Sequence, residues 1–200
     1  MGAYMRGLLV TQLLWSNHTH SISFYTNAFL GNLKSDAELL EIGPGHGLLL
    51  ARAVKALPNG KVTGWDVSAS SLSHTRSPCG TGRSWGFNLQ ARNLFDQQAE
   101  QFDAVVFSEV LEHLEDPAGA LRAIRSLIRP GGKLFLNVPI NSPAPDHIFL
   151  LRSPDETFDL VRNQGFDILE TGCFPATNYS MEQALRHDLT ISVSLIATPA

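Results

Sequence analysis

Three glycines at alternate positions, Gly43, Gly45 and Gly47, follow an apolar run over residues 37–42, and Glu41 stands two residues before the first of them. The apolar run predicts a buried parallel strand, and residues 48–57 predict a helix that ends at Pro58. Such a strand, glycine turn and helix let a ligand approach the backbone and offer it the free N–H groups of a helix start. We therefore predict that this turn binds a nucleotide-like cofactor.

The spacing indicates which cofactor. A dinucleotide turn reads G-x-G-x-x-G and places a pyrophosphate on the helix N-terminus, whereas here the third glycine comes one residue early. Glu41 would repel a phosphate and suits a ligand that carries positive charge. S-adenosylmethionine (SAM) has a sulfonium and an ammonium and no phosphate. The E-x-G-x-G-x-G turn resembles motif I of the class I SAM-dependent methyltransferases.

Two further segments extend the resemblance. Residues 61–66 predict the second strand, and Asp66 at its end could accept hydrogen bonds from both ribose hydroxyls, as an acidic residue does at the matching place in the family; the alternative is an N-cap for the next helix. Asn93 and Leu94 fall where the family has an acidic residue followed by a small one, and Asn93 can still accept from the adenine amino group. The resemblance implies these cofactor-binding residues: Glu41, Gly43, Pro44, Gly45, Gly47, Asp66, Val67, Asn93, Leu94 and Ser108.

Acid and base candidates follow the strand predicted at residues 102–107. In the resembled family the stretch after this strand, here residues 108–117, closes beneath the cofactor and faces the acceptor. Glu109, His113 and His147 are the candidate general bases, with His147 in the long loop predicted over residues 139–152. Structural alternatives are a tether for Glu112 and His113 and a helix cap for His147.

Glu109, Glu112 and His113 have spacing i, i+3, i+4, which predicts one face of a helical turn. Together with His147 they are similar to the metal site of small-RNA 2′-O-methyltransferases of the Hen1 type, which use an E-x-x-E-H motif and a later histidine. The same sequence motif occurs in many class I enzymes with no known metal requirement. Our prediction is a site without metal, and a divalent cation on these four residues is the alternative.

Strand and helix patterns alternate along most of the chain, which predicts an α/β fold with a doubly wound, mainly parallel sheet in a single domain. The resemblance implies seven strands, the last of them antiparallel. Residues 1–35 predict a lid of two helices separated by a polar break at 17–21, and residues 36–200 the methyltransferase domain. Residues 75–86 have no helical period and predict a loop, and the form of residues 173–187 stays open.

The composition and net charge limit the classes of binding partner that we expect. Hydrophobic residues make up 44% and charged residues 17%, and 15 Lys and Arg stand against 19 Asp and Glu, for a net charge of −4. This balance gives no general attraction to nucleic acid or to an anionic membrane. Two cysteines form no disulfide framework, so we expect a cytoplasmic protein.

The predicted function is methyl transfer from SAM to an O, N or C atom of a small-molecule acceptor. An RNA methyltransferase, which would need a basic track, and an inactive SAM-fold binding protein are the alternatives. The sequence leaves the acceptor and the oligomeric state open.

Overall fold

The computed structural model describes residue 10 and residues 14–76, 86–96 and 99–200. Seven strands form one sheet in the order β3-β2-β1-β4-β5-β7-β6. Strands β1 to β5 pair in parallel, whereas β7 runs antiparallel to both of its neighbours. The strands are β1 (Glu38–Ile42), β2 (Lys61–Asp66), β3 (Phe87–Ala91), β4 (Phe102–Ser108), β5 (Ile128–Ile140), β6 (Phe166–Pro175) and β7 (Ile191–Pro199). The predicted doubly wound sheet with an antiparallel last strand is confirmed.

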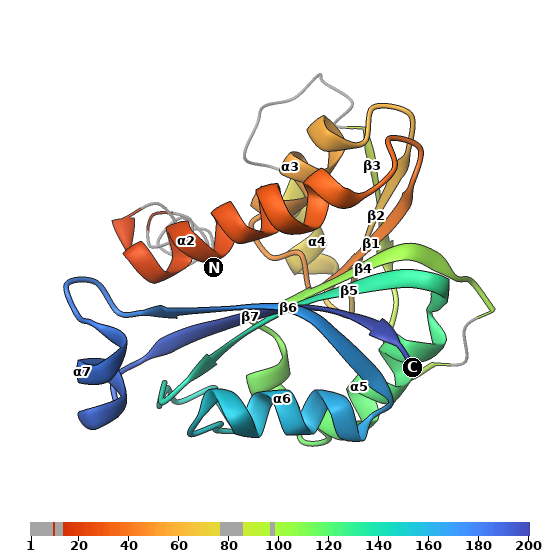
Figure 1. Ribbon diagram of the computed structural model, residues 1–200. Helices are drawn as coiled ribbons and strands as arrows, with labels where there is room; N and C mark the ends of the chain where they lie inside the picture. The colour runs from red at the N-terminus through yellow and green to blue at the C-terminus, as the bar shows by residue number, and fades with distance from the viewer. Residues whose placement is uncertain (1–9, 11–13, 77–85, 97–98) are drawn as a thin grey trace.

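Helices cover both faces of this sheet (Figure 1). The helical elements are α2 (Ser16–Phe24), the π-helical turn η1 (Tyr25–Phe29), η2 (Leu30–Asn32), α3 (Leu48–Ala56), α4 (Ala69–Arg76), the 3₁₀ turn η4 (Leu111–His113), α5 (Pro117–Ser126), α6 (Pro154–Asn163) and α7 (Met181–Arg186). Elements α2, η1, α3 and α4 lie on one face, and α5 and α6 lie on the other.

The hydrophobic core consists of two clusters, one on each face of the sheet, because successive side chains of a strand point to opposite faces. On β4, Val105 and Phe107 join the cluster under α5 and α6, whereas Val106 joins the cluster under α2 and α3. On β5, Phe135 faces the second cluster between residues that face the first. Both faces of the central strands are therefore buried, as their continuous apolar runs predict.

The N-terminal segment differs from our prediction. Residues 17–21, which we expected to break the helix, form the middle of α2. Asn17 and Ser21 point at the sheet and hydrogen-bond to Ser192 and Ser194 of β7, so the amide nitrogen of Asn17 and the hydroxyl of Ser21 find partners inside the fold rather than in solvent. Polar residues at these positions therefore dock the helix instead of ending it.

The remaining local predictions differ mainly in extent. Asp116 accepts a hydrogen bond from the backbone N–H of Gly119 at 2.7 Å and caps α5, with Pro117 as its first residue, as predicted. Strand β5 is longer than expected and begins at Ile128, before the glycine turn. Residues 173–187, whose form was open, contribute the end of β6 and then α7. The loop predicted at 75–86 falls largely outside the described residues, and α4 continues to Arg76.

A first prediction concerns η1. Phe29 is fully buried, and its ring centroid lies 5.7 Å from that of Tyr25 and 5.5 Å from that of Phe135. Phe29→Ala should lower the free energy of unfolding by about 3–5 kcal/mol, because it opens a cavity inside the core. Urea denaturation measures this, with Leu169→Ala at an exposed β6 position as the control, expected to cost less than about 1 kcal/mol. A loss below that value for Phe29→Ala would show that η1 is only an added cover.

Candidate active site

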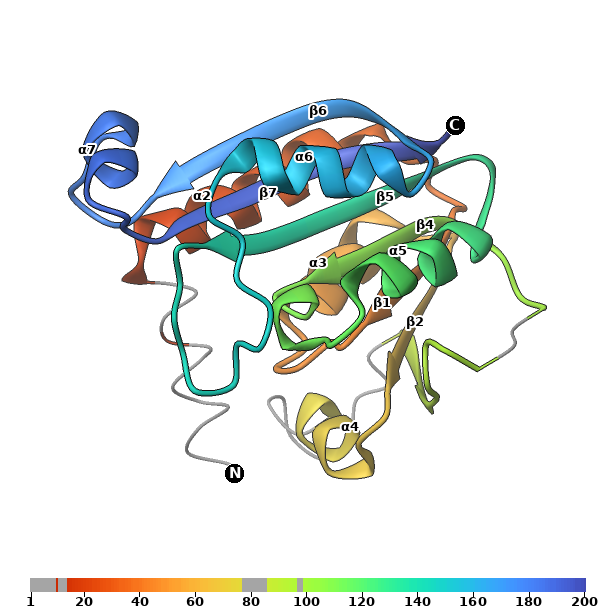
Figure 2. The same ribbon diagram turned by 90° about the horizontal axis from the view of Figure 1, so that it is seen from below.

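A cavity of about 450 Å³ opens at the carboxyl ends of β1, β4 and β5. Parallel strands bring their carboxyl ends to one edge of the sheet, so segments far apart in sequence meet there. Figure 2 shows the segment after β4 and the loop after β5 at this edge. The cavity is lined by eight of the residues predicted for the site: Glu41, Gly43, Pro44, Gly45, Ser108, Glu109, His113 and His147.

The glycine turn forms one wall. Gly43, Gly45 and Gly47 have φ values of 69°, 49° and 77°, a region that side chains strongly disfavour. Space is also restricted, because a Cβ on Gly43 would lie 2.6 Å from Cγ2 of Val110. The backbone N–H of Gly43 donates to the carbonyl of Trp65 at 2.8 Å, which fixes the turn beside the end of β2.

Glu41 is the last but one residue of β1, and only 3% of its surface is exposed. Its Oε2 has no hydrogen-bond partner among the described residues. Burial raises the pKa of Glu41 to about 8, against a smaller opposing contribution from the backbone N–H of Leu50. In the free protein this carboxyl is therefore largely protonated at neutral pH, and a cation beside it would favour the charged form.

Glu109 does not share a helical face with Glu112 and His113, so that prediction is wrong. Glu109 has φ 55°, in the left-handed region, and the helical turn begins only at Leu111. Its side chain is held by Nδ2 of Asn137, 2.8 Å from Oε1. Burial raises the pKa of Glu109 to about 7, and the Asn137 hydrogen bond opposes this rise.

Glu112, His113 and His147 do come together, each offering one potential metal-ligand atom within 4.8 Å of the others. Glu112 is 1% exposed, and both of its carboxyl oxygens are buried without a partner among the described residues. Burial, and next the Glu109 carboxylate, raise the pKa of Glu112. Glu109 lies outside this group of three, which corrects the four-residue set considered from the sequence.

Backbone carbonyls set the tautomers of the two histidines. Nδ1 of His113 lies 2.7 Å from the Asp146 carbonyl oxygen, and Nδ1 of His147 lies 2.6 Å from that of Ser142. A carbonyl can only accept, so in both neutral rings the proton sits on Nδ1. Each Nε2 then carries a lone pair, which can take a proton or bind a metal ion.

The loop after β5 is fastened to η4 by two hydrogen bonds. The backbone N–H of Phe149 donates to the Glu112 carbonyl at 2.9 Å, and His113 bonds to the Asp146 carbonyl. His113 thus has the tether role that was the alternative to catalysis, while its Nε2 stays unused by that bond.

The other predicted cofactor residues lie outside the cavity lining. Gly47 is the N-cap residue of α3, and a Cβ there would meet Cγ2 of Thr75 at 3.0 Å, so this glycine serves close packing. Asp66 accepts from the Ser68 backbone N–H at 2.8 Å and from Ser71 Oγ at 2.6 Å, so it supports the start of α4, whereas the N-cap is Ser68, whose Oγ accepts from the Ser71 backbone N–H at 3.2 Å. Val67 beside it is 73% exposed.

Asn93 and Leu94 lie after β3. Oδ1 of Asn93 accepts from the backbone N–H of Phe95 at 3.0 Å. Leu94 is buried and packs in the core cluster below α5. Their adenine contacts, like the ribose contact of Asp66, stay predictions.

The sequence analysis did not predict two histidines and two other polar residues that line the cavity. His18 and His46 both line it, and burial lowers the pKa of each. Asn17 and Ser192 form the wall at α2 and β7. His46 lies inside the glycine motif and could have been found there. The place of His18 in the cavity lining was not predicted, because His18 lies in the stretch that we expected to be a polar break between two helices.

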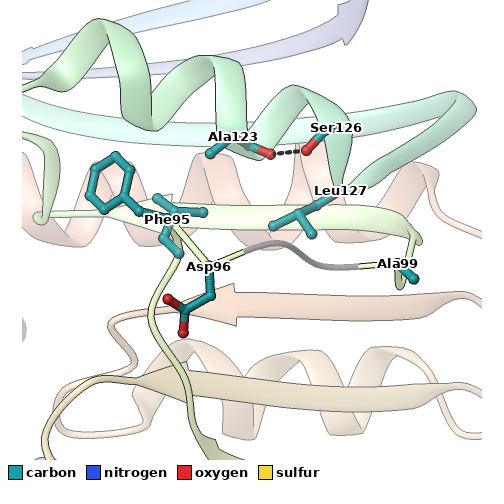
Figure 3. A pocket seen from close by; sticks show the side chains of 7 residues that line it. Phe95, Asp96, Ala99, Ala123, Ser126 and Leu127 are labelled. Atoms are coloured by element: carbon teal, nitrogen blue, oxygen red, sulfur yellow. Dashed lines mark hydrogen bonds between the residues drawn. The ribbon is translucent and has the colours of Figure 1, made fainter.

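A second hollow lies below the β3–β4 connection, against α5 (Figure 3). Its lining includes Phe95, Ala123 and Leu127, with Asp96 as the acidic residue. The one hydrogen bond drawn there joins Ser126 Oγ to the Ala123 carbonyl inside the helix. No imidazole, thiol or basic side chain is among its described lining residues, so we assign it no chemistry.

Comparison with known proteins identifies the family that the chain resembles. A family model described as "Methyltransferase domain" matches residues 40–134, which include the glycine turn and residues 108–117. The ubiquinone biosynthesis O-methyltransferase of Xanthomonas axonopodis pv. citri is 36% identical over 110 residues, covering 54% of this chain and 45% of the relative. The enzyme of that name from Pseudomonas syringae pv. tomato is 32% identical over 126 residues, covering 62% and 53%. The chain thus spans about half the length of the curated relatives it matches.

Solved structures show the same fold at low identity. The N-methyltransferase NodS from Bradyrhizobium japonicum, in complex with S-adenosyl-L-homocysteine (SAH), superposes with a TM-score of 0.66 at 17% identity, covering 92% of this chain and 88% of NodS. The [4+2]-cyclase SpnF superposes with a TM-score of 0.71 at 17% identity, covering 90% and 81%. The fold is therefore shared by proteins whose names indicate different reactions.

Among the described residues, no helix has the length and apolar character that a bilayer-spanning helix requires.

A second prediction concerns pH. The raised pKa of Glu41 means that the native state keeps a proton that the unfolded chain releases above about pH 4.5. The free energy of unfolding therefore keeps its full value below about pH 4.5. As the pH rises from there toward about 8, it falls by on the order of 4–5 kcal/mol. Glu41→Gln should remove this part of the decline, as measured by urea denaturation of the ligand-free protein between pH 5 and 8.5. Exposed Glu170→Gln is the control, and parallel curves for Glu41→Gln and wild type would contradict the prediction.

Proposed function

The chain belongs to the class I SAM-dependent methyltransferase family, and we propose that it transfers a methyl group from SAM to an oxygen of a small hydroxylated molecule. The observation that carries this proposal is the glycine turn opening on a cavity whose nearest carboxyl group, Glu41, is buried and has an unpartnered oxygen. O-methylation of a small molecule is supported by the names of the relatives, which are O-methyltransferases of ubiquinone biosynthesis.

The residues of the cavity fit a cation. Its buried oxygens without a partner among the described residues, on Glu41, Glu112 and Asn17, are all hydrogen-bond acceptors. The lining contains no Lys or Arg in the part of the chain that the structure describes. A ligand with ammonium and sulfonium groups would supply the missing positive charge and donors. An RNA backbone would bring more negative charge to this wall, so the RNA alternative gains no support here.

SAM supplies the methyl group on a sulfonium, which is already a good leaving group. The protein then has to hold the acceptor oxygen in line and take up its proton. Nε2 of His147 carries a lone pair because the Ser142 carbonyl occupies Nδ1, so we assign His147 as the general base. Glu109 and Nε2 of His113 line the same cavity and face the acceptor beside it.

The N-terminal segment is proposed to act as a lid. Trp15, Asn17 and His18 line the cavity together with the glycine turn. Tyr25 and Phe29 of the following turn are buried in the core, so this lid is anchored and does not form an independent layer.

A second candidate adds a divalent cation. The cluster of Glu112, His113 and His147 favours it, since neither Glu112 oxygen has a hydrogen-bond partner among the described residues and Nε2 of His113 lies 3.9 Å from Glu112 Oε1. These three residues would hold the ion, and an ion there lowers the pKa of a bound hydroxyl. His147 would then be a ligand and not the base.

A third prediction tests the ribose contact. Asp66→Ala should weaken binding of SAH by about 1.5–3 kcal/mol, the contribution of a hydrogen bond to a charged group. Ser71→Ala is the matched control, because it removes the Asp66 contact to α4 and keeps the carboxylate. Calorimetric titration of SAH measures both. Equal weakening by the two variants would assign Asp66 to the start of α4, and unchanged affinity in Asp66→Ala would remove it from the cofactor site.

A fourth prediction tests the base. Acceptors are found by screening phenols, catechols and matched amines with labelled SAM. His147→Gln should lower kcat by about 10²–10⁴-fold, the usual contribution of a general base, without weakening SAH binding. His20→Gln is the matched control, since that ring lies beside Phe174, with centroids 5.8 Å apart, and outside the cavity lining.

Treatment with a chelator distinguishes the reaction in which His147 is the general base from the metal-assisted reaction. If His147 is the base, turnover continues after exhaustive EDTA treatment. Loss of turnover in EDTA, and its recovery with Mg²⁺, Mn²⁺ or Zn²⁺, would instead establish the metal-assisted reaction. Activity with none of these acceptors, with tight SAH binding retained, would favour a binding protein.

A further inference from the structure

A row of buried polar side chains crosses the sheet on the face covered by α2 and ends in the cavity. Ser21 Oγ of α2 lies 2.8 Å from Ser194 Oγ of β7, and Ser194 Oγ lies 2.9 Å from Oδ1 of Asn137 on β5. Asn137 Nδ2 then donates to Glu109 Oε1 at 2.8 Å and to Ser108 Oγ at 3.2 Å. Ser21, Asn137 and Ser194 are at most 5% exposed, in a region that is otherwise apolar.

Helix and strand match in spacing along this row. Asn17 and Ser21 are four residues apart on a helix, or about 6 Å, and Ser192 and Ser194 are two apart on a strand, or about 6.6 Å. Asn17 Nδ2 donates to Ser192 Oγ at 3.0 Å, parallel to the bond between Ser21 and Ser194. Two bonds of equal spacing fix α2 in one register on β7, because any shift would leave buried hydroxyls unpaired.

Asn137 holds Glu109 at two points. Its carbonyl accepts from the backbone N–H of Glu109 at 2.9 Å, and its side-chain amide binds the carboxyl group. Glu109 has a left-handed backbone, which a non-glycine residue keeps only where its surroundings impose it. Both its backbone and its side chain are therefore placed by one residue of β5.

The direction of each bond follows from the chemistry of its atoms. The amide nitrogen of Asn137 donates to Glu109 Oε1 and to Ser108 Oγ, so its Oδ1 faces Ser194. Oδ1 only accepts, so the Ser194 proton is directed toward it. Ser194 Oγ is then left to accept the proton of Ser21. A hydroxyl at position 21 thus completes the only arrangement in which every member is satisfied.

We propose that Asn137 is a positioning residue for Glu109, and that α2 fixes the orientation of the Asn137 amide through Ser21 and Ser194. The docking of the N-terminal helix is thereby linked to the placement of a carboxylate that it does not touch. This inference rests on the proposed function only in taking Glu109 as a group that faces the bound acceptor. The link itself is a property of the folded protein without ligand.

The link is tested by a double-mutant cycle of Ser21→Ala and Glu109→Ala in urea denaturation of the full chain. Residues without a shared network have additive effects, whereas members of one network do not. We expect the unfolding equilibrium constant of the double variant to depart from the product of the single effects by a factor of about five. Exposed Ser23→Ala on the same helix is the control and should combine additively with Glu109→Ala. Additivity in both cycles would overturn the proposal.

Its consequence for catalysis is read from kinetics with the phenol or catechol identified by the screen. Ser21→Ala should lower kcat about tenfold, leave the SAH dissociation constant within about twofold, and be rescued by Ser21→Thr, which keeps the hydroxyl. An unchanged kcat, or a loss that Ser21→Thr fails to rescue, would overturn the positioning role. Full activity of Glu109→Gln would instead reject the assignment of Glu109 in the proposed function. Absence of any turnover leaves the unfolding cycle to decide the link.

Discussion

The site depends on carboxyl groups that the fold buries without a cationic side chain beside them. Glu41 and Glu112 are buried and Glu109 is half-buried, all three line one cavity, and no Lys or Arg lines that cavity among the described residues. Burial raises the pKa of all three carboxyl groups and lowers that of His18 and His46, so the same cause favours neutral forms of both acids and bases. Burial thus lowers the negative charge that these three carboxyl groups carry in the free cavity near neutral pH. A cation that enters restores ionised carboxylates by proton release, which couples ligand binding to pH.

The sheet topology explains why such groups meet. Strands β1 and β4 are parallel neighbours, with Ile42 beside Phe107, so Glu41 and Glu109 leave the sheet at the same edge. Strand β7 runs the other way, which brings Ser192 near its start, and Thr190 just before it, to this edge as well. The reversed strand thus supplies the hydroxyl groups on which α2 docks. One inversion in an otherwise parallel sheet therefore contributes part of the cavity lining.

Local features of the sequence predicted much of this. The glycine turn, the strand before it and the capped start of α5 depend on neighbours in sequence, and they were correct in type and close in extent. The polar stretch at 17–21 was misread because its partners lie some 170 residues away on β7, and a helix that buries Asn17 and Ser21 has no simple apolar period. Glu109 was misplaced for a related reason, since its left-handed backbone is imposed by Asn137 from another strand. The errors therefore fall where tertiary hydrogen bonds, and not local preference, decide the conformation.

The chemistry of the site is concentrated in one loop and one turn, and this division has a physical basis. A fold alone does not determine a reaction. In the proposed function the sheet and its glycine turn hold the cofactor, whereas the carbonyls of Ser142 and Asp146 decide which nitrogen of His147 and of His113 carries the lone pair. Both carbonyls belong to the loop after β5, and a backbone bond from Phe149 to Glu112 ties that loop to η4. The proton-accepting groups and the buried carboxyl of Glu112 therefore keep their relative placement as one unit. Replacing that loop would change the reaction at the acceptor while leaving the glycine turn intact.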